Sequence, residues 1–285
     1  MSTDRPIGRL AILGLGLMGG SLARAVSGLQ VATRVTGWSP ESTERDAALT
    51  TGAVGFAAAS WRQAVSDADL VVLAMPLHAC ARLLRDVGDA APAHATLTDL
   101  ASLNAPLSRV AAQSGLDHRF VGGHPMAGAE LSGFWASRAD LFEGATVWIS
   151  PGSREPEAEA RVRAVERMWA AVGGQPRRIE AREHDRMMAL VSHLPQLTSN
   201  ALAVALQGAG VDRSRLGPGG RDMTRLSGSS PDMWGELLQH ASPELIAGLR
   251  MLGDAAVRIA DALEAGDVAS VTELMRRTKS WKGRG

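Results

Sequence analysis

The sequence predicts an α/β protein in which a doubly wound parallel sheet is followed by an all-α domain. Short apolar runs typical of buried strands alternate with helix-like runs as far as residue 180. Continuous apolar strands separated by helices indicate a parallel sheet that is covered on both faces. From residue 181 onward, helix-like runs follow one another without strands between them. We therefore expect a first domain over residues 1–180 and a helical second domain over residues 181–285.

Apolar runs bounded by turn residues are expected to form the strands, and amphipathic runs the helices. The strands cover Arg9 to Leu13, Arg34 to Trp38, Leu70 to Met75, Ala95 to Leu100, Phe120 to Gly123, Ala145 to Ser150 and Arg177 to Glu180. The main helices cover Leu17 to Leu29, Pro40 to Thr51, Glu183 to Leu206, Pro243 to Ala265 and Val268 to Lys279. The segment from Gln207 to Ser230, rich in glycine and arginine, is expected to be a loop with short helical turns.

Composition argues against two classes of partner. Lys plus Arg equals Asp plus Glu at 30 each, whereas a general nucleic-acid binder usually has a basic excess. The longest apolar runs are far shorter than the ~20 residues that a membrane span needs, and the N-terminus has no apolar signal-like segment. The single cysteine, Cys80, is compatible with a reducing compartment. We expect a cytoplasmic protein that binds a small-molecule substrate and neither nucleic acid nor a membrane.

A glycine turn follows the first expected strand and opens the first expected helix. Gly14, Gly16 and Gly19 form the pattern GxGxxG. In a Rossmann-type sheet these glycines allow a tight turn, a close approach of the backbone to a pyrophosphate, and close packing of helix on strand. Leu17 and Met18, at the start of the helix, are expected to bind the cofactor with them. The alternative is a glycine turn in an α/β protein that binds no nucleotide.

The residue at the end of the second strand bears on which dinucleotide binds. An NAD site usually has Asp or Glu there, about 20 residues after the glycines, but this chain has Ser39. A serine cannot repel the 2′-phosphate of NADP as a carboxylate would, so Ser39 favours NADP over NAD. NAD remains open, because no arginine immediately follows and Glu41 could still reach the ribose.

Beyond the glycine turn, four stretches resemble the prephenate/arogenate dehydrogenase family over nearly the whole chain. They are TDLASLN (Thr98 to Asn104), GGHPMAGAE (Gly122 to Glu130), EHDRMMALVSHLPQ (Glu183 to Gln196) and GGRDMTRLSGSSPDMW (Gly219 to Trp234). The resemblance implies an oxidative decarboxylation, in which a cyclohexadienol loses hydride to NAD(P) and carbon dioxide from its ring. The ring becomes aromatic, and the product is tyrosine or 4-hydroxyphenylpyruvate.

That chemistry needs a base, and the resemblance assigns this role to His124. It follows an expected strand, at the sheet edge where doubly wound folds bind ligands, and a neutral imidazole is the usual proton acceptor near pH 7. The resemblance also implies that Ser102 hydrogen-bonds the reacting hydroxyl and the histidine. The structural alternatives are a loop histidine held by backbone bonds and, for Ser102, the N-cap of a helix before Pro106. We expect no metal site.

Substrate-binding residues are implied farther along the chain. Arg225 matches the family's carboxylate-binding arginine, and a guanidinium can clamp a carboxylate with two hydrogen bonds. The alternative is a surface arginine, since Arg213, Arg215 and Arg221 lie nearby. Further pocket residues implied by the resemblance are Ser192, His193 and Trp234. His184 is expected to be structural, because nine residues on a helix put it roughly opposite His193.

Two departures from the family bear on the substrate. Prephenate-type members commonly have histidine where this chain has Gln196, and some have threonine where it has Ala129. A neutral amide can accept a hydrogen bond from the ammonium of arogenate. Gln196 therefore favours arogenate over prephenate.

Two alternative functions remain, and an assembly is expected. One alternative is a β-hydroxyacid or imine dehydrogenase, although these rely on a lysine that the helical domain lacks outside its tail. The other is a non-catalytic nucleotide sensor, which needs neither His124 nor Arg225.

A homodimer is expected through the C-terminal helices, where Met251, Leu252, Val257, Ile259 and Leu263 supply more apolar surface than a small domain buries alone.

Overall fold

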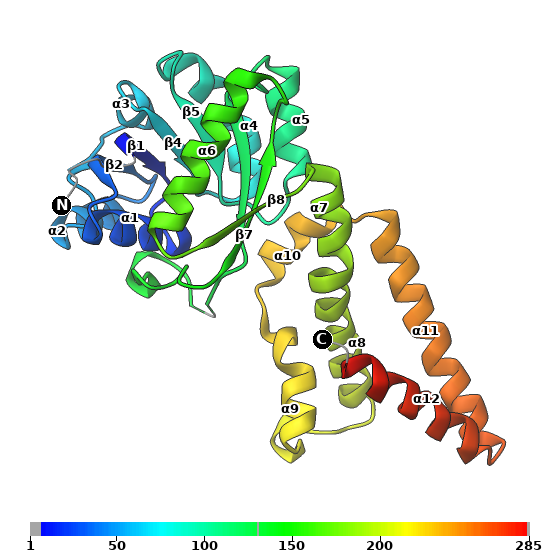
Figure 1. Ribbon diagram of the computed structural model, residues 1–285. Helices are drawn as coiled ribbons and strands as arrows, with labels where there is room; N and C mark the ends of the chain where they lie inside the picture. Colours follow the sequence, from blue (N-terminus) through cyan, green and yellow to red (C-terminus); the bar gives the residue numbers. More distant parts are fainter. Residues whose placement is uncertain (1–6, 130, 284–285) are drawn as a thin grey trace. The chain divides into compact units, whose positions relative to one another are not determined.

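A computed structural model describes residues 7–129 and 131–283, and the chain divides into two compact units (Figure 1). One unit runs to Asp185 and also includes Ser230–His240. The other unit consists of Arg186–Ser229 and the chain from Ala241 onward. The segment 230–240 thus packs with the sheet-containing unit, whereas the sequence analysis assigns everything after residue 180 to the second domain. Glu130, the last residue of the GGHPMAGAE stretch, and the first six residues lie outside the described part.

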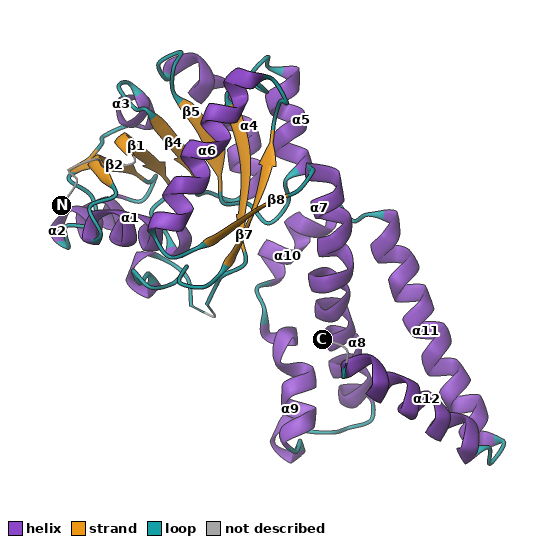
Figure 2. Cartoon of the chain, viewed as in Figure 1, coloured by secondary structure: helices purple, strands orange, loops and turns teal. Residues whose placement is uncertain are grey.

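The first unit is built on one eight-stranded sheet with the order β3-β2-β1-β4-β5-β6-β7-β8. Figure 2 shows the strands in orange. Each strand from β3 to β6 in this spatial order is parallel to its neighbours within that range, as expected for a doubly wound sheet. The predicted fold class is confirmed. The short strand β3 was not expected. The strands are β1 (Ile7–Leu13), β2 (Ala32–Trp38), β3 (Phe56–Ala57), β4 (Leu70–Leu73), β5 (Thr96–Asp99), β6 (Phe120–Pro125), β7 (Thr146–Pro151) and β8 (Gln175–Arg178).

One pairing departs from the expected parallel sheet, because β7 runs antiparallel to β6. A parallel neighbour requires a crossover, usually a helix. Among the described residues of this connection, the regular structure is a 3₁₀ turn, η1 (Phe134–Ala136), and no crossover helix is present, so the chain returns beside β6 in the opposite direction. The helix α6 (Pro156–Ala171) then provides a crossover, and β8 pairs parallel to β7.

Helices cover both faces of the sheet, and each face has its own apolar cluster. On one face lie α1 (Leu17–Gly28), α2 (Ser42–Thr50) and α6; on the other lie α3 (Trp61–Val65), α4 (Leu77–Ala90) and α5 (Ala105–Gln113). Trp169 of α6 is fully buried edge-to-face on Phe142, with ring centroids 5.0 Å apart. Burial of such a side chain contributes about 1.5–3 kcal/mol, so the helices are fixed to the sheet mainly by apolar packing.

The second unit is helical throughout its described residues, as expected. Its elements are the end of α7 (Ala181–Met188), the π-helical turn η2 (Ala189–His193), α8 (Leu194–Gly208), the 3₁₀ turn η3 (Arg213–Arg215), α9 (Pro218–Thr224), the 3₁₀ turn η4 (Arg225–Gly228), α11 (Pro243–Glu264) and α12 (Val268–Lys282). The predicted helix over 183–206 is thus continuous but contains a π turn just before Pro195, which has no N–H to donate. Helix α10 (Pro231–Leu238) belongs to the first unit.

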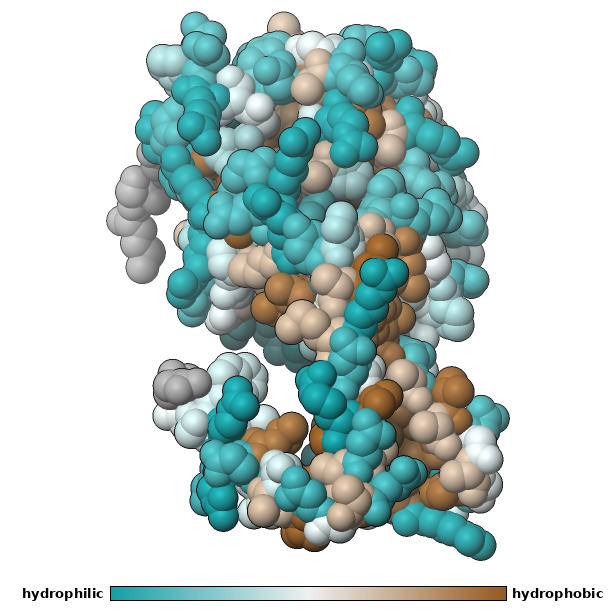
Figure 3. Space-filling model, turned by 90° about the vertical axis from the view of Figure 1, so that its right-hand side faces the viewer, coloured by the Kyte–Doolittle hydropathy of each residue, from teal (hydrophilic) through white to brown (hydrophobic). Residues whose placement is uncertain are grey.

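The surface of the second unit carries many apolar side chains, which Figure 3 shows in brown. Met251, Val257 and Leu263 of α11 are 69%, 58% and 55% exposed. Large apolar patches on a soluble protein usually mark an interaction surface. Among the described residues, no helix is both long enough and apolar enough to cross a bilayer.

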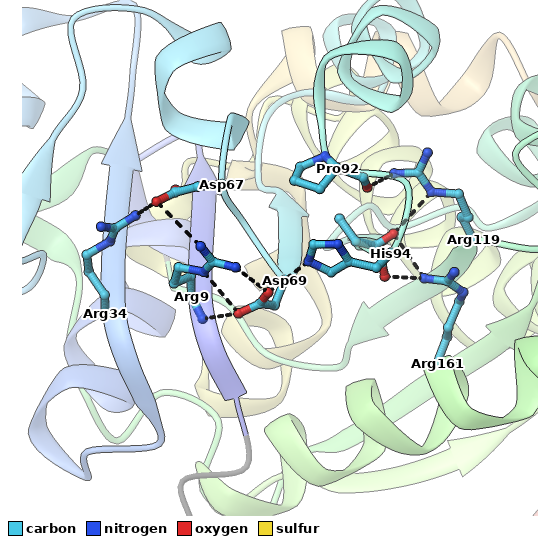
Figure 4. Close-up of polar contacts among 9 residues, drawn as sticks. Arg9, Arg34, Asp67, Asp69, Pro92, His94, Arg119 and Arg161 are labelled. Atoms are coloured by element: carbon cyan, nitrogen blue, oxygen red, sulfur yellow. Dashed lines mark hydrogen bonds and ion pairs between the residues drawn. The ribbon is translucent and has the colours of Figure 1, made fainter.

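An ionic network joins the amino ends of neighbouring strands, on the sheet edge opposite the glycine turn (Figure 4). Asp69, just before β4, accepts hydrogen bonds from the backbone and guanidinium of Arg9 on β1, and its Oδ1 lies 2.9 Å from Nε2 of His94. These bonds, chiefly from the Arg9 side chain, lower the pKa of Asp69 to about 2. Arg119 donates to three backbone carbonyls, those of Gly88, Pro92 and Ala95. The network therefore fixes the spacing of β1, β4 and β5.

Replacing Asp69 by asparagine is expected to lower the free energy of unfolding at pH 7 by about 1 kcal/mol, allowing for solvent screening. The folded-state pKa lies below the unfolded value of 3.8, so the carboxylate stabilises the fold above that pH. This contribution is lost as the pH falls through about 2, where wild type and variant should converge. Urea unfolding at neutral and at acidic pH measures the difference. Asp86→Asn is the control, since Asp86 is an exposed carboxylate on α4, whereas Asp67 is itself paired with Arg34; equal losses would contradict a specific role for Asp69.

Candidate active site

The glycine turn between β1 and α1 has the shape that a dinucleotide requires. Gly14 has φ +100°, and a Cβ atom there would lie 2.4 Å from the carbonyl oxygen of Ala74. A Cβ on Gly19 would lie 1.9 Å from the carbonyl oxygen of Gly14, so both positions exclude any side chain. At Gly16 the nearest atom to such a Cβ is a carboxylate oxygen of Glu44, at 3.7 Å. The space at Gly16 is open, as it must be for a pyrophosphate to approach.

The other predicted cofactor residues are placed around this turn. Leu17 and Met18 begin α1 and pack, half-buried, against the apolar cluster on that face of the sheet. Their side chains thus anchor the helix whose N-terminus faces the turn. Ser39, directly after β2, is buried, and its hydroxyl donates a hydrogen bond to Glu44 at 2.5 Å. The end of β2 therefore has a carboxylate beside it, although the residue at that position is a serine.

His124 lies in β6 and begins a chain of hydrogen bonds. Its Nδ1 lies 2.9 Å from Nε2 of His184, whose Nδ1 lies 2.8 Å from Oδ1 of Asp185. His184 is fully buried, while His124 is half-buried. His184 thus holds the ring of the candidate base, a form of structural role that its own helix does not indicate. The relative positions of His184 and His193 on one helix do not indicate that His184 contacts His124 of β6, which lies 60 residues earlier in the chain.

Asp185 also fixes the start of helix α5. Its two carboxylate oxygens accept hydrogen bonds from the backbone N–H groups of Asn104, at 2.8 Å, and Ala105, at 3.0 Å. The N-cap residue of α5 is Asn104, so the alternative of Ser102 as an N-cap is wrong. A carboxylate at a helix N-terminus pairs with unsatisfied N–H groups and with the helix dipole. Asp185 thus fixes α5 and His184 together, a role that the sequence analysis missed.

A buried carboxyl, Asp99, lies beneath the segments that carry Ser102 and His124. It ends β5 and accepts hydrogen bonds from the backbone N–H of Ala101, at 2.7 Å, and of Gly123, at 3.4 Å. Complete burial raises the pKa of Asp99 to about 8, despite these two hydrogen bonds. Burial therefore favours the neutral form of this carboxyl. Its hydrogen bonds hold Ala101 and Gly123, which directly precede Ser102 and His124, at the same carboxyl group.

A cavity of 350 Å³ opens at the carboxyl ends of β4 and β5 within the first unit. Ser102 lines it, as do residues that follow β4 and residues of α10. They are Met75, Pro76, Leu77, His78, Leu100, Ala101, Asp232, Met233, Glu236 and Leu237. Glu236 accepts a hydrogen bond from the backbone N–H of His78 at the start of α4, so a carboxylate fixes this helix as Asp185 fixes α5. Trp234 of α10 packs against the apolar cluster on this face of the sheet.

Within the second unit, the turn that begins with Arg225 is fastened to helix α8. Gln196 donates from Nε2 to the carbonyl oxygen of Leu226 at 2.6 Å and accepts from the hydroxyl of Ser229 at 3.2 Å. Ser199 accepts from the backbone N–H of Ser227 at 3.1 Å. Arg225 itself is exposed, and its guanidinium pairs with no carboxylate among the described residues. The turn is fixed while the charged group remains available to an anion.

The remaining predicted residues occupy two places. Ser192 and His193 lie in the π-helical turn η2, where His193 is buried and Ser192 half-buried. π turns occur frequently at functional sites. Ala129 is exposed in the connection between β6 and β7. Across residues 7–129 and 131–283, no three or more His, Cys, Asp or Glu side chains are grouped so as to hold a metal ion.

Comparison with known proteins identifies the family. A family model described as the nucleotide-binding domain of prephenate dehydrogenase matches residues 22–177, more than half of the chain. The chain belongs to the prephenate dehydrogenase family. A second model, the dimerization domain of prephenate dehydrogenase, matches residues 180–277. The resemblance that the sequence motifs carried is therefore confirmed.

Individual members of the prephenate dehydrogenase family show the extent of the similarity. A prephenate dehydrogenase of Bacillus subtilis is 30% identical over 247 residues, which are 83% of this chain and 65% of that protein, so this chain spans less than two thirds of that relative. A cyclohexadienyl dehydrogenase of Zymomonas mobilis is 29% identical, covering 83% of this chain and 82% of that protein. The crystal structure of the Aquifex aeolicus prephenate dehydrogenase with hydroxyphenyl propionate and NAD+ has a TM-score of 0.82 and 25% identity, over 97% of each chain.

Proposed function

We propose that this chain catalyses the oxidative decarboxylation of arogenate and/or prephenate, with hydride transfer to NAD or NADP. The product is tyrosine or 4-hydroxyphenylpyruvate. The main support is the hydrogen-bonded chain from His124 through His184 to Asp185, at the carboxyl edge of the sheet. Ligands of doubly wound folds bind at this edge. Family membership and the shape of the glycine turn support the same proposal.

The chain of hydrogen bonds defines which atom of His124 is the base. An ionised carboxylate only accepts hydrogen bonds, so Asp185 requires a proton on Nδ1 of His184. A neutral His184 then accepts, at Nε2, a hydrogen bond from the Nδ1–H of His124. The unprotonated atom of a neutral His124 is therefore Nε2, which can take up a proton. The positive charge that develops on His124 is stabilised through His184 by the carboxylate of Asp185.

In the proposed reaction, Nε2 of His124 accepts the proton of the ring hydroxyl as the carbon beneath it is oxidised. When bound, the oxidised nicotinamide supplies the hydride acceptor. The electron pair of the ring carbon–carboxylate bond then enters the ring, carbon dioxide leaves, and the resulting phenolate recovers the proton from His124. Ser102 lines the neighbouring cavity, and its hydroxyl can hold the substrate oxygen in place.

The proposed reaction also requires residues that bind the dinucleotide and the carboxylate of the substrate's side chain. The glycines of the turn and the N-terminus of α1 would bind the pyrophosphate of the cofactor. Arg225 would clamp the carboxylate of the substrate's side chain, with Ser192, His193 and Trp234 as further pocket residues. Gln196 would act on Arg225 as a positioning residue, because its amide holds the turn that begins there.

Arogenate is the substrate that Gln196 favours. The amide of Gln196 is buried and neutral, and its oxygen accepts one hydrogen bond, from Ser229. A carbonyl oxygen can accept two, so an ammonium can be accommodated there, whereas a protonated histidine would repel it. Ala129, which is small and exposed, would present no further polar group to the side chain of the substrate. We expect the specificity constant for arogenate to be at least as high as that for prephenate.

Parallel assays of reduced-cofactor formation test this function. Arogenate, prephenate and a β-hydroxyacid are each supplied with NAD or NADP, and carbon dioxide release is measured alongside. Turnover of either cyclohexadienol with release of carbon dioxide is the expected result. Turnover of the β-hydroxyacid alone would favour the β-hydroxyacid dehydrogenase alternative. Dinucleotide binding without turnover of any of the three would favour a nucleotide sensor.

We also propose that the protein is a homodimer through its C-terminal helices. The exposed apolar residues of α11, namely Met251, Leu252, Val257 and Leu263, would be buried against a second copy, and the half-buried Ile259 would add to that surface. The match to a family model described as a dimerization domain favours a copy of the same chain as the partner. Light scattering at micromolar concentration should give twice the chain mass. A monomeric mass would contradict the proposal.

A further inference from the structure

We infer that Glu44, in the first turn of α2, selects the dinucleotide and favours NAD over NADP. The inference deepens the proposed function and rests on it, since it concerns the cofactor of the same site. It reverses the preference that the sequence gives from Ser39 alone. The observation that carries it is the place of the Glu44 carboxylate, between Ser39 and Gly16.

The two oxygens of Glu44 have different surroundings. Oε2 accepts the hydrogen bond from the hydroxyl of Ser39, which is 2% exposed at the end of β2. Oε1 lies 3.7 Å from the position that a Cβ atom of Gly16 would occupy. One oxygen is thus anchored to the end of β2, and the other borders the open space beside the second glycine of the turn.

That location is where an NAD site needs a carboxylate. In Rossmann folds, an acidic residue at the end of the second strand accepts a hydrogen bond from the ribose 2′-hydroxyl, next to the glycine turn. In this chain α2 begins at Ser42, soon after β2 ends at Trp38, so its first turn brings Glu44 back toward the strand end. Ser39 therefore acts as the anchor and Glu44 as the acceptor. A carboxylate there would repel the 2′-phosphate of NADP.

Two charged neighbours of Glu44, Arg45 and Glu41, are engaged or placed differently. Arg45 could in principle bind a 2′-phosphate, but its Nη1 donates to the backbone carbonyls of Ser39 and Pro40 and so holds the loop. Glu41, the other carboxylate expected to be able to reach the ribose, is the N-cap residue of α2 and is exposed. Glu41 makes a matched control, because its substitution removes the same charge near the start of the same helix without touching the Ser39–Glu44 contact.

The test is the equilibrium binding of NADH and NADPH to the purified full chain, followed by cofactor fluorescence and by calorimetry. Wild type should bind NADH more tightly than NADPH. Glu44→Gln should weaken NADH binding by about tenfold or more, the usual effect of losing a charged hydrogen-bond acceptor, and should strengthen NADPH binding. Glu41→Gln should leave the ratio of the NADPH dissociation constant to the NADH dissociation constant unchanged. Glu44→Gln should lower this ratio, and Ser39→Ala should lower it by a smaller factor.

The outcomes separate the inference from the proposed function. Wild type that binds neither dinucleotide would overturn the proposed function, and the inference with it. Wild type that binds NADPH as tightly as NADH would overturn the inference alone, and a loss of that binding in Arg45→Gln would assign selection to Arg45. Equal effects of Glu44→Gln and Glu41→Gln would also overturn it. If Glu44→Gln lowers the thermal midpoint of the protein, its binding data are replaced by those of Ser39→Ala, which removes the anchor of Glu44. An unchanged ratio of the NADPH and NADH dissociation constants in Ser39→Ala would then overturn the inference.

Discussion

Replacing His124 by asparagine is expected to lower kcat by roughly two to four orders of magnitude, the usual contribution of a positioned general base. Asparagine keeps a polar side chain on β6 but has no nitrogen that can take up the proton. The affinity for the dinucleotide should stay nearly unchanged, because the glycine turn between β1 and α1 is built from other residues. Steady-state kinetics with arogenate and prephenate, together with cofactor binding by fluorescence, measure both quantities.

The control for this substitution is His118→Asn. His118 is exposed, in the turn that precedes β6, and is no part of the hydrogen-bonded chain to Asp185. This variant should retain the activity of the wild type. A His124→Asn variant with nearly full kcat would show that another group removes the proton, and the proposed mechanism would then be wrong.

Replacing Arg225 by alanine is expected to act mainly on KM, which should rise by a factor on the order of 100. A guanidinium that clamps a carboxylate contributes to ground-state binding as well as to the transition state, so kcat should change less. The fold should be retained, because Arg225 is exposed and its turn is held by Gln196 and Ser199. Initial rates over a wide range of substrate concentration separate KM from kcat.

Arg213→Ala is the matched control, since Arg213 is another exposed arginine of the same segment. It tests whether a general loss of positive charge weakens the binding of an anionic substrate. If both variants raised KM equally, the effect would be one of overall charge, and the assignment of Arg225 as the carboxylate clamp would fail.

The sequence by itself determined the elements and the motifs, because these depend on short-range patterns. Apolar runs gave most of the strands to within a few residues, and the glycine spacing predicted a turn that the packing at Gly14 and Gly19 requires. The family resemblance was equally accessible, since it rests on consecutive residues such as those around His124. Helical character after residue 181 followed from periodicity alone.

Only the tertiary structure decided which distant groups meet. His124 meets His184 across 60 residues, Asp185 fixes the start of α5 across 80 residues, and Glu236 fixes that of α4 across 158 residues. Such contacts depend on the order and direction of strands, which no local pattern specifies; the antiparallel β7 is an example. Ser39 shows the same limit at short range. The residue at the end of β2 is not a carboxylate, yet the first turn of α2 brings the carboxylate of Glu44 against it. The direction of a side chain on a helix depends on the helical period as well as on its position in the chain.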